Sequence, residues 1–319
     1  MGATRSNFSK GKDCLMSEFR FDGRVAVITG AGRGIGRSYA MLLAAKGAKI
    51  VVDDPGHSIK GEGADAGVAE EVVREIKAAG GEAVACTDSV ATPAGGNAIV
   101  QAAMDHYGRI DILVHNAGNV RRSPLKEMSH EDFDGVLDVH LRGAFHVVRP
   151  AFALMCKAGY GRVVLTSSDV GLYGNANAGN YSVAKAGMIG LSNNVAIEGA
   201  ADGVKSNCIV PAAVTRMAEG LDTSLYPPMP PELVAPAVAW LAHESCSITG
   251  ELLLSVAGRV ARAYVTETRG VYSNAWTIEE IAGKIDAIRN RDTTVTFDVV
   301  PSGHLDHLRY SFEMARKGS

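Results

Sequence analysis

A tyrosine and a lysine four positions apart, Tyr181 and Lys185, are the residues of this sequence with the most evident chemistry, and Ser167 and Ser168 precede the tyrosine by fourteen and thirteen residues. On a helix, side chains four residues apart lie on the same face. A lysine ammonium beside a tyrosine favours the phenolate, so we predict that Lys185 lowers the pKa of Tyr181 from its ordinary value of about 10. The pair would then act as a general acid and base near neutral pH. Because such a pair is also typical of an ordinary solvated helix face, the surrounding sequence has to distinguish the two readings.

Short apolar runs alternate with longer amphipathic segments, which is typical of strand–helix units around a parallel sheet. We predict strands at 24–29, 49–53, 82–86, 110–115, 161–166, 205–210 and 251–255, and helices near 34–46, 65–79, 92–107, 129–157, 180–200 and 231–242. Continuous apolar runs such as Val25–Ile28 indicate strands that are covered on both faces. The predicted fold class is therefore α/β, a doubly wound, Rossmann-type parallel sheet of about seven strands with helices on both faces.

Three regions are predicted along the chain: a loose polar tail at 1–20, a catalytic domain at 21–258 and a C-terminal extension at 259–319. Within the domain, the proline-rich stretch 211–231 lies at the carboxyl edge of the sheet, where it is either a lid over a ligand or a plain surface excursion. The connection 55–67 is lengthened by glycine and proline and is predicted to be a loop.

The C-terminal extension is predicted to be partly helical. One helix is expected from Thr277, where Glu280 three residues later forms a capping box, and a second helix is expected from about Ser302. The extension would cover either a neighbouring subunit's active site or the edge of its own sheet.

Composition excludes several classes of protein. The formal net charge of −3 gives no indication of nucleic-acid binding, and no apolar run is long enough to span a membrane. The five cysteines lack Cys-x-x-Cys spacing, which favours free thiols in a reducing compartment over disulfides, and no metal site is expected. The sequence has neither a signal peptide nor a C-terminal Ser-Lys-Leu address, so a cytoplasmic location is expected.

A glycine-rich turn, Thr-Gly-Ala-Gly-Arg-Gly-Ile-Gly at 29–36, follows the first predicted strand and opens the first predicted helix. Its glycines permit a tight turn and let a pyrophosphate approach the helix N-terminus. The acidic pair Asp53-Asp54 ends the second strand, and an acid at that place can accept the ribose hydroxyls and would repel a 2′-phosphate, which favours NAD. Arg33 and Arg37 would instead favour NADP. We give the carboxylate more weight because it also penalises the wrong cofactor.

Together, these motifs resemble the short-chain dehydrogenase/reductase family. The glycine turn, Asp-Ser-Val at 88–90, Asn-Ala-Gly at 116–118, the serine pair, Tyr-Ser-Val-Ala-Lys at 181–185 and Ile-Val-Pro at 209–211 follow in order between Phe21 and Gly258. The resemblance implies an NAD(P)-dependent oxidoreductase that transfers hydride between a nicotinamide cofactor and a secondary alcohol or ketone. It also implies a homodimer or homotetramer.

The resemblance further implies roles for single residues. Tyr181 would exchange the hydroxyl proton, Lys185 would assist it and bind the nicotinamide ribose, and Ser168 would orient the substrate oxygen. His140 stands where the family commonly has an asparagine that helps to hold a proton-relay water; it would support that water through its ring or its backbone, or simply be a packed histidine. The residues expected at the cofactor are Gly30, Arg33, Gly34, Ile35, Gly36, Asp54, Asp88, Ser89, Asn116, Ala117, Gly118, Tyr181, Lys185, Pro211 and Thr215.

Finer features are similar to one branch of the family, the (3R)-hydroxyacyl-CoA dehydrogenase units of peroxisomal multifunctional enzymes. They are the loop Ser-Ile-Lys-Gly-Glu-Gly at 58–63 and the segments 140–143, 172–175 and 240–246. The similarity favours a 3-hydroxyacyl-CoA substrate in β-oxidation of a fatty or steroid side chain. A hydroxysteroid or other secondary-alcohol dehydrogenase, and an inactive nucleotide-binding scaffold, are the alternatives. Candidate phosphate contacts are Arg121, Arg122, Arg142, Arg216, Arg259 and Arg262.

Overall fold

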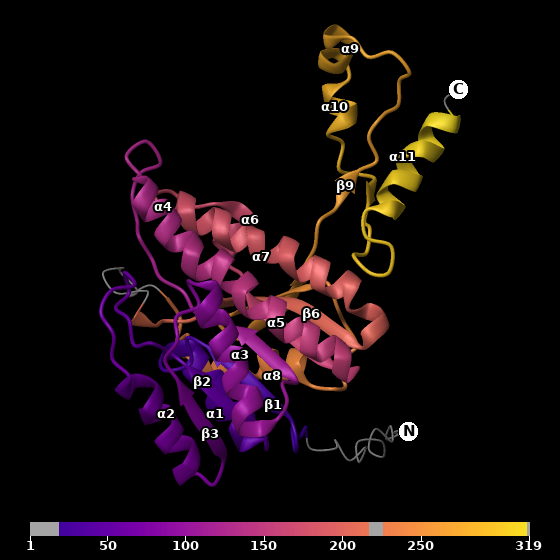
Figure 1. Cartoon of the computed structure of the whole chain (residues 1–319). Helices are drawn as coiled ribbons and strands as arrows, with labels where there is room; N and C mark the ends of the chain where they lie inside the picture. Colours follow the sequence, from indigo (N-terminus) through magenta and orange to yellow (C-terminus); the bar gives the residue numbers. More distant parts are fainter. Residues whose placement is uncertain (1–18, 217–225, 318–319) are drawn as a thin grey trace, which may run out of the picture.

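One twisted sheet of eight strands runs through the structure, a computed structural model that describes residues 19–216 and 226–317 (Figure 1). The strand order is β3-β2-β1-β4-β5-β6-β7-β8, with parallel pairing throughout except between β7 and β8. The strands are β1 (Val25–Thr29), β2 (Lys49–Asp53), β3 (Glu82–Cys86), β4 (Ile112–His115), β5 (Gly161–Thr166), β6 (Val204–Ala212), β7 (Leu252–Val256) and β8 (Arg259–Ala263). The predicted fold class is confirmed.

The edge strand β8 is the one strand of this sheet that the sequence pattern does not predict. It pairs antiparallel with β7, from Val256 opposite Arg259 to Leu252 opposite Ala263. The intervening Ala257 and Gly258 both have positive φ, at 50° and 81°, as a two-residue hairpin turn requires. Consequently the first part of the predicted C-terminal extension belongs to the central sheet.

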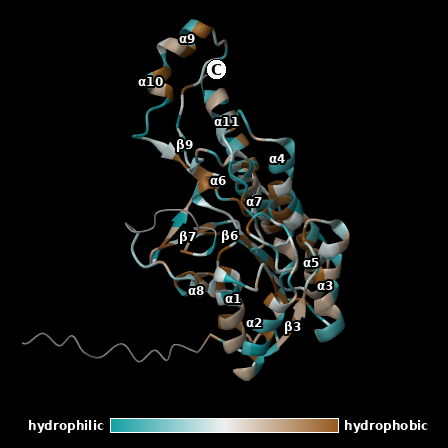
Figure 2. Ribbon diagram, turned by 90° about the vertical axis from the view of Figure 1, so that its left-hand side faces the viewer, coloured by the Kyte–Doolittle hydropathy of each residue, from teal (hydrophilic) through white to brown (hydrophobic). Residues whose placement is uncertain are grey.

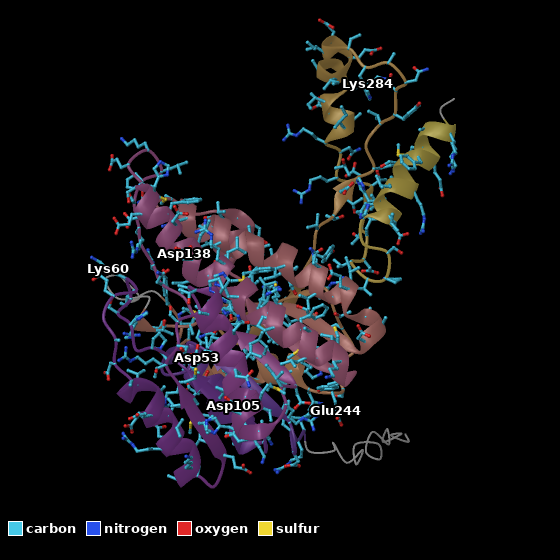
Figure 3. The ribbon with its side chains drawn as sticks, in the orientation of Figure 1. Asp53, Lys60, Asp105, Asp138, Glu244 and Lys284 are labelled. Atoms are coloured by element: carbon cyan, nitrogen blue, oxygen red, sulfur yellow. The ribbon has the colours of Figure 1, made fainter. Side chains whose placement is uncertain are left out.

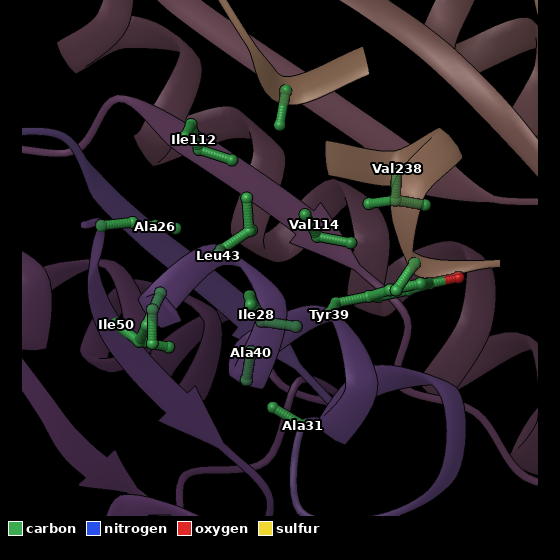
Figure 4. Packing of buried hydrophobic residues seen from close by; sticks show 14 of the residues in the cluster. Ala26, Ile28, Ala31, Tyr39, Ala40, Leu43, Ile50, Ile112, Val114 and Val238 are labelled. Carbon is green, nitrogen blue, oxygen red and sulfur yellow. The ribbon is translucent and has the colours of Figure 1, made fainter. Parts of the chain in front are cut away.

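Helices cover both faces of the sheet, and each face has its own apolar core. The helices are α1 (Gly34–Ala45), α2 (Gly67–Ala78), α3 (Pro93–Tyr107), α4 (His130–Leu137), α5 (Gly143–Ala158), α6 (Asp169–Tyr173), α7 (Gly179–Glu198) and α8 (Ala235–Ala242), with one-turn helices at Ala200–Asp202 and Pro231–Leu233. One core joins α1, α2 and α8 to the sheet, and the other joins α3, α5 and α7 to it. Figure 4 shows the first core, where Tyr39 of α1 lies beside Val238 of α8. All five residues of β1 are buried because both faces are covered.

The predicted helix at 129–157 is interrupted between α4 and α5. Residues Asp138–Arg142 form a turn of π-helix, with His140 at its centre. Such turns insert one residue into a helix and often occur at functional sites. The interruption decides the direction in which the His140 side chain points.

The C-terminal extension projects from the body of the molecule beyond β8 (Figure 1). It contains β9 (Glu267–Thr268), α9 (Ile278–Gly283), α10 (Ile285–Ile288), β10 (Thr294–Val295) and α11 (Leu305–Lys317). The capping box of Thr277 and Glu280 is present as predicted. Figure 2 shows hydrophobic positions among the polar ones on α9 and α10, and Ile278 is 84% exposed.

None of the described helices combines the length and the apolar character needed to cross a membrane.

Candidate functional site

Two adjoining pockets lie at the carboxyl ends of the parallel strands, where open α/β sheets bind ligands. The first contains Gly30 and Asp54, and we call it the glycine-turn pocket. The second contains Ser168 and Tyr181, and we call it the tyrosine pocket. Both pockets share the lining residues Ile35, Asn116, Gly118 and Thr215, so one extended ligand would occupy both.

Most of the predicted cofactor residues meet in these pockets. The glycine-turn pocket is lined by Gly30, Arg33, Gly34, Ile35, Asp54, Ser89, Asn116, Ala117, Gly118 and Thr215. The tyrosine pocket is lined by Ser168, Tyr181, Lys185, Pro211 and His140. Two of the predicted residues, Gly36 and Asp88, line neither pocket.

Gly36 instead supports the glycine turn from behind. A Cβ at this position would stand 2.1 Å from the Gly30 carbonyl oxygen and 2.6 Å from Nδ2 of Asn116, so only glycine lets α1 pack here. Gly30 and Gly34 have φ values of 63° and 54°, which glycine adopts without strain. The Asn116 amide donates to the Gly30 carbonyl at 3.1 Å and fixes the turn to the end of β4. This close backbone approach is the cradle that a pyrophosphate needs.

The loop 55–67 contributes lining that the sequence pattern does not reveal. Its residues His57, Ser58, Ile59 and Gly61 face the glycine-turn pocket. The loop is held by the Val120 N–H, which donates to the Ile59 carbonyl at 3.0 Å. Lys60, labelled in Figure 3, accepts a hydrogen bond from Nε of Arg121 at its carbonyl, at 3.3 Å. The contact joins residues sixty-one positions apart, so no local signal announces it.

The two acids that follow one another at the end of β2 have different environments. Asp54 accepts hydrogen bonds from the N–H groups of Gly32, at 3.0 Å, and Gly56, at 2.8 Å, and its carboxylate faces the glycine-turn pocket. Arg37, which would favour NADP, forms an ion pair with Glu75 instead. The Asp54 side chain, predicted to favour NAD, is thus fixed at the pocket, whereas one of the two arginines predicted to favour NADP is paired elsewhere.

Asp53 is fully buried at the floor of the same pocket, with 0% of its surface exposed. Neither of its carboxyl oxygens has a hydrogen-bond partner of normal geometry among the described residues. Burial raises the pKa of Asp53 well above its ordinary value, and the negative charges of Asp54 and Asp88 raise it further, while the Cys86 thiol on the adjacent strand partly offsets this. Asp53 therefore retains its proton well above the pH at which an exposed aspartate ionises.

The two serines after β5 serve different partners. The Ser168 hydroxyl donates to Oδ1 of Asp169 at 2.8 Å and accepts from the Val170 N–H at 3.1 Å, which caps α6. It also hydrogen-bonds the Tyr181 phenol. Ser167 instead donates to the Lys185 carbonyl at 2.8 Å and anchors α7. Ser168 is thus the serine that meets Tyr181.

The sequence predicts that Lys185 lowers the pKa of Tyr181. With the side chains of this protein alone, that prediction is wrong. Burial raises the pKa of Tyr181 to about 12, a shift that the Ser168 hydrogen bond and the positive charge of Arg122 oppose only in part. Burial also lowers the pKa of Lys185 to about 7. The Lys185 ammonium donates to the Thr166 carbonyl at 2.6 Å and stands 5.5 Å from the centre of the Tyr181 ring. Desolvation of both groups outweighs their mutual attraction.

His140 is buried in the wall of the tyrosine pocket, with its ring edge-to-face against Tyr181. Burial, and then the charge of Lys185, hold the pKa of His140 well below its ordinary value, so the ring is neutral. Its backbone carbonyl accepts a hydrogen bond at 3.0 Å from Nε2 of His115, whose own pKa burial lowers to about 3.

The predicted lid lies partly outside the described residues, because 217–225 are not among them. Of the stretch 211–231, Tyr226 and Met229 line the tyrosine pocket, and the Val214 N–H donates to the Met229 carbonyl at 2.8 Å. The described part of the chain contains no group of three or more His, Cys, Asp or Glu side chains arranged to hold a metal ion.

Comparisons with known proteins agree with this geometry. A family model described as short chain dehydrogenase matches residues 24–224. The chain is 48% identical over 254 residues to the peroxisomal multifunctional enzyme type 2 of Drosophila melanogaster and 45% identical over 257 residues to that of Mus musculus. These matches cover 79% and 80% of this chain but 42% and 35% of the relatives, so the chain spans less than half of their length.

Solved structures give the same result. A short chain dehydrogenase from Mycobacterium avium matches with a TM-score of 0.74 and 40% identity, covering 84% of this chain and 94% of that one. The full-length Drosophila melanogaster enzyme matches with a TM-score of 0.78 and 37% identity, covering 93% of this chain and 50% of that one.

The buried proton of Asp53 has a measurable consequence for stability. Since the pKa of Asp53 is raised in the folded protein, the unfolded chain, in which the pKa is about 3.9, releases this proton first. The protonated Asp53 side chain therefore stabilises the folded protein fully below the pKa of the unfolded chain. This stabilisation is lost as the pH rises toward the pKa that Asp53 has in the folded protein. We expect Asp53→Asn to make the free energy of unfolding fall less steeply with pH than in the unmodified protein, in urea titrations between about pH 5 and pH 8.

Asp105→Asn is the matched control, because Asp105 is an exposed aspartate on α3 (Figure 3). It should leave the slope of stability against pH unchanged. An equal slope for Asp53→Asn and the unmodified protein would show that Asp53 is ionised in the folded state.

Proposed function

Because this chain belongs to the short chain dehydrogenase family of oxidoreductases, we propose that it transfers hydride between NAD and the 3-hydroxyl carbon of a 3-hydroxyacyl-CoA. The observation that carries the proposal is the meeting of Ser168, Tyr181 and Lys185 in one pocket that adjoins the glycine-turn pocket. The named relatives support the substrate, since both are multifunctional enzymes of the peroxisome.

The residues present fit a dinucleotide. The glycine turn leaves no room for a Cβ at Gly36, and Asp54 presents a carboxylate to the same pocket. Gly30, Gly34 and the N-terminus of α1 would hold the pyrophosphate, and Asp54 would hold the adenosine ribose. When bound, the nicotinamide supplies the hydride acceptor for alcohol oxidation and the donor for ketone reduction.

The chain's own groups manage the proton. In alcohol oxidation, the Tyr181 oxygen takes the proton of the substrate hydroxyl; in ketone reduction it returns that proton. The Ser168 hydroxyl, fixed by Asp169 and the Val170 N–H, orients the reacting oxygen beside it. Lys185 is held by Thr166 at the buried end of the same pocket, where its charged form favours the tyrosinate.

Tyr181→Phe tests the acid/base role, because it removes the phenolic oxygen and little else. We expect kcat to fall by about 10²- to 10⁴-fold, the usual contribution of a general acid or base. Tyr173→Phe on α6 is the control, since Tyr173 is 79% exposed and lines neither pocket. Dehydrogenase activity that survived the loss of the Tyr181 hydroxyl would require another acid/base.

With an intact Tyr181, the rate of alcohol oxidation should increase as the pH rises toward about 12. Burial raises the pKa of the phenol to that value, and oxidation consumes its deprotonated form.

The preference for NAD over NADP rests on Asp54. Replacing it by alanine removes the carboxylate that would repel a 2′-phosphate, so we expect the ratio of kcat/KM for NADP to that for NAD to rise by at least about 10-fold, equivalent to about 1.4 kcal/mol. Arg37→Ala serves as control and should leave the ratio unchanged, because Arg37 is paired with Glu75. A ratio that responded to Arg37 and not to Asp54 would point to NADP as the natural cofactor.

Arg122 is the best candidate for recognition of the CoA group. Of the six candidate arginines, three are paired with acids: Arg121 with Asp132, Arg142 with Asp134 and Arg262 with Glu251. Arg122 lines the tyrosine pocket with its side chain exposed, and its charge acts on Tyr181. An arginine at a pocket mouth suits a phosphate.

We expect a 3-hydroxyacyl-CoA to have a higher kcat/KM than the same acyl group on a short thioester, and Arg122→Ala to reduce this advantage by about 10-fold, as for loss of one charged hydrogen bond. Arg259→Ala is the control, because Arg259 is exposed on β8 and lines neither pocket. Equal values for the two thioesters would exclude CoA recognition. Turnover of hydroxysteroids alone would favour that alternative, and NAD binding without turnover of any alcohol would favour a scaffold.

A homodimer or homotetramer is part of the same proposal. The extension supports it, because Val265 is 78% exposed and Phe312 is 55% exposed. The cytoplasmic location expected from the sequence stays a prediction, since both named relatives are peroxisomal.

A further inference from the structure

The His140 ring contacts Asn119 through a nitrogen and packs against the Tyr181 ring. Its Nε2 lies 2.8 Å from the carbonyl oxygen and 3.1 Å from the amide nitrogen of Asn119. Its ring centre lies 5.2 Å from that of Tyr181, with the planes at 85°. Edge-to-face packing of this kind is favourable and fixes the relative orientation of the rings. The imidazole therefore stands between the cofactor-side segment 116–119 and the acid/base.

Gly118 makes this arrangement possible. A Cβ at Gly118 would stand 2.3 Å from Cε1 of His140, 3.0 Å from Nε2 and 3.1 Å from Nδ1. Any other residue would have to displace the imidazole or the backbone. Gly118 lines both pockets, so the histidine ring packs directly beneath the point where they meet.

The backbone of His140 is tied to the same segment by a second route. Nε2 of His115 donates to the His140 carbonyl at 3.0 Å, and Nδ1 of His115 lies 3.0 Å from the Thr29 hydroxyl oxygen. That hydroxyl accepts from the N–H groups of Asn116 and Ala117, at 3.1 Å each. Segment 116–119 is thus bonded to His140 at both of its ends, once through the ring and once through the backbone.

The remaining ring nitrogen, Nδ1, has no hydrogen-bond partner among the described residues. Each nitrogen of a neutral imidazole either donates or accepts, so Nε2 makes one hydrogen bond with the Asn119 backbone, as donor to its carbonyl or as acceptor from its N–H. The titratable groups that act on the ring are Lys185 and His115 of β4. A buried histidine kept for stability alone would be expected to satisfy both nitrogens.

We propose that His140 is a positioning residue for the proposed dehydrogenation: its ring holds the Tyr181 phenol in register with segment 116–119, and so with a dinucleotide that rests on that segment. This inference rests on the proposed function but adds a coupling between the two pockets. In this arrangement, the absence of a side chain at Gly118 leaves the space that the His140 ring occupies. A shift of reacting groups by about 1 Å is enough to cost about 10²-fold in rate.

The test is a double-mutant cycle between Gly118→Ala and His140→Ala. Gly118→Ala pushes the ring away and His140→Ala removes it, so each is expected to lower kcat by about 10²-fold. Because His140→Ala also makes room for the added methyl group, the double variant should be no slower than His140→Ala alone. If the two losses multiply, the residues act independently and the proposal is overturned. Gly190→Ala on α7 is the control, because a Cβ there meets nothing within 4 Å.

A second readout does not depend on turnover. NMR of ring-labelled tyrosine gives the pKa of Tyr181, which burial raises to about 12. Removing the imidazole admits water, so in His140→Ala we expect this pKa to fall toward its ordinary value of about 10, whereas Gly190→Ala should leave it in place. An unchanged Tyr181 pKa in a folded His140→Ala protein would contradict the proposal.

A substitute variant and a measurement of NAD binding distinguish loss of positioning from loss of folding or of cofactor binding. If His140→Ala does not fold, His140→Gln replaces it, since glutamine keeps a hydrogen-bond group for Asn119 without an aromatic ring, and the same shift of the Tyr181 pKa is expected. The dissociation constant of NAD, measured by calorimetry, should stay within about 3-fold of the unmodified value, since Asp54 and the glycine turn are untouched. A loss of NAD binding that matched the loss of kcat would make His140 a structural residue. A protein that binds NAD but oxidises no alcohol would defeat the proposed function while leaving the NMR result to decide the role of His140.

Discussion

The hydroxyl of Thr29 is the point on which both pockets depend. It accepts hydrogen bonds from two consecutive N–H groups, those of Asn116 and Ala117, at 3.1 Å each. Parallel strands end with backbone groups that the sheet no longer satisfies, and a buried group left unpaired is costly. The Thr29 side chain, at the end of β1, satisfies both N–H groups. It thereby holds the segment that follows β4 against the glycine turn. The Asn116 amide then reaches the Gly30 carbonyl, and His115 is placed to hold His140. One strand end therefore fixes both the segment on which we propose that the cofactor rests and the backbone of His140.

Burial sets the electrostatics of the site more strongly than pairing does. Spacing alone suggests that Lys185 stabilises a Tyr181 phenolate, yet burial raises the pKa of the tyrosine to about 12 and lowers that of the lysine to about 7. Both shifts have the same cause, since a low-dielectric surrounding disfavours whichever form is charged. A sequence reports the separation of two residues along a helix, but it does not report how dry their surroundings are.

The parts of the site that could be predicted are those with local causes. The glycine turn follows from strand–turn–helix chemistry within a few residues, whereas the choice of Asp54 and of Ser168 follows from the resemblance to the family. The loop 55–67 could not be placed, because its contact with Val120 and Arg121 joins distant segments. β8 was missed because Arg-Val-Ala-Arg-Ala alternates weakly, as an exposed edge strand does. The π-helical turn at His140 could not be predicted either, because the contacts that accompany it, with Asn119, His115 and Tyr181, join segments that are distant in the sequence.

Asp53, the last residue of β2, and Asp54, which follows it, lie in different surroundings although they are adjacent in the sequence. Side chains of a strand alternate between its two faces, so Asp54 meets the backbone of the glycine turn while Asp53 turns toward Cys86. Asp53 then adds no negative charge beside the pocket in which we propose that a dinucleotide, itself carrying two phosphates, binds. If both were charged, Asp53 would repel the ligand as well as Asp54, and folding would have to bury an unpaired charge. Keeping Asp53 protonated would let Asp54 hold the ribose in the role proposed for it at a lower electrostatic cost, and this division follows from the period of the strand.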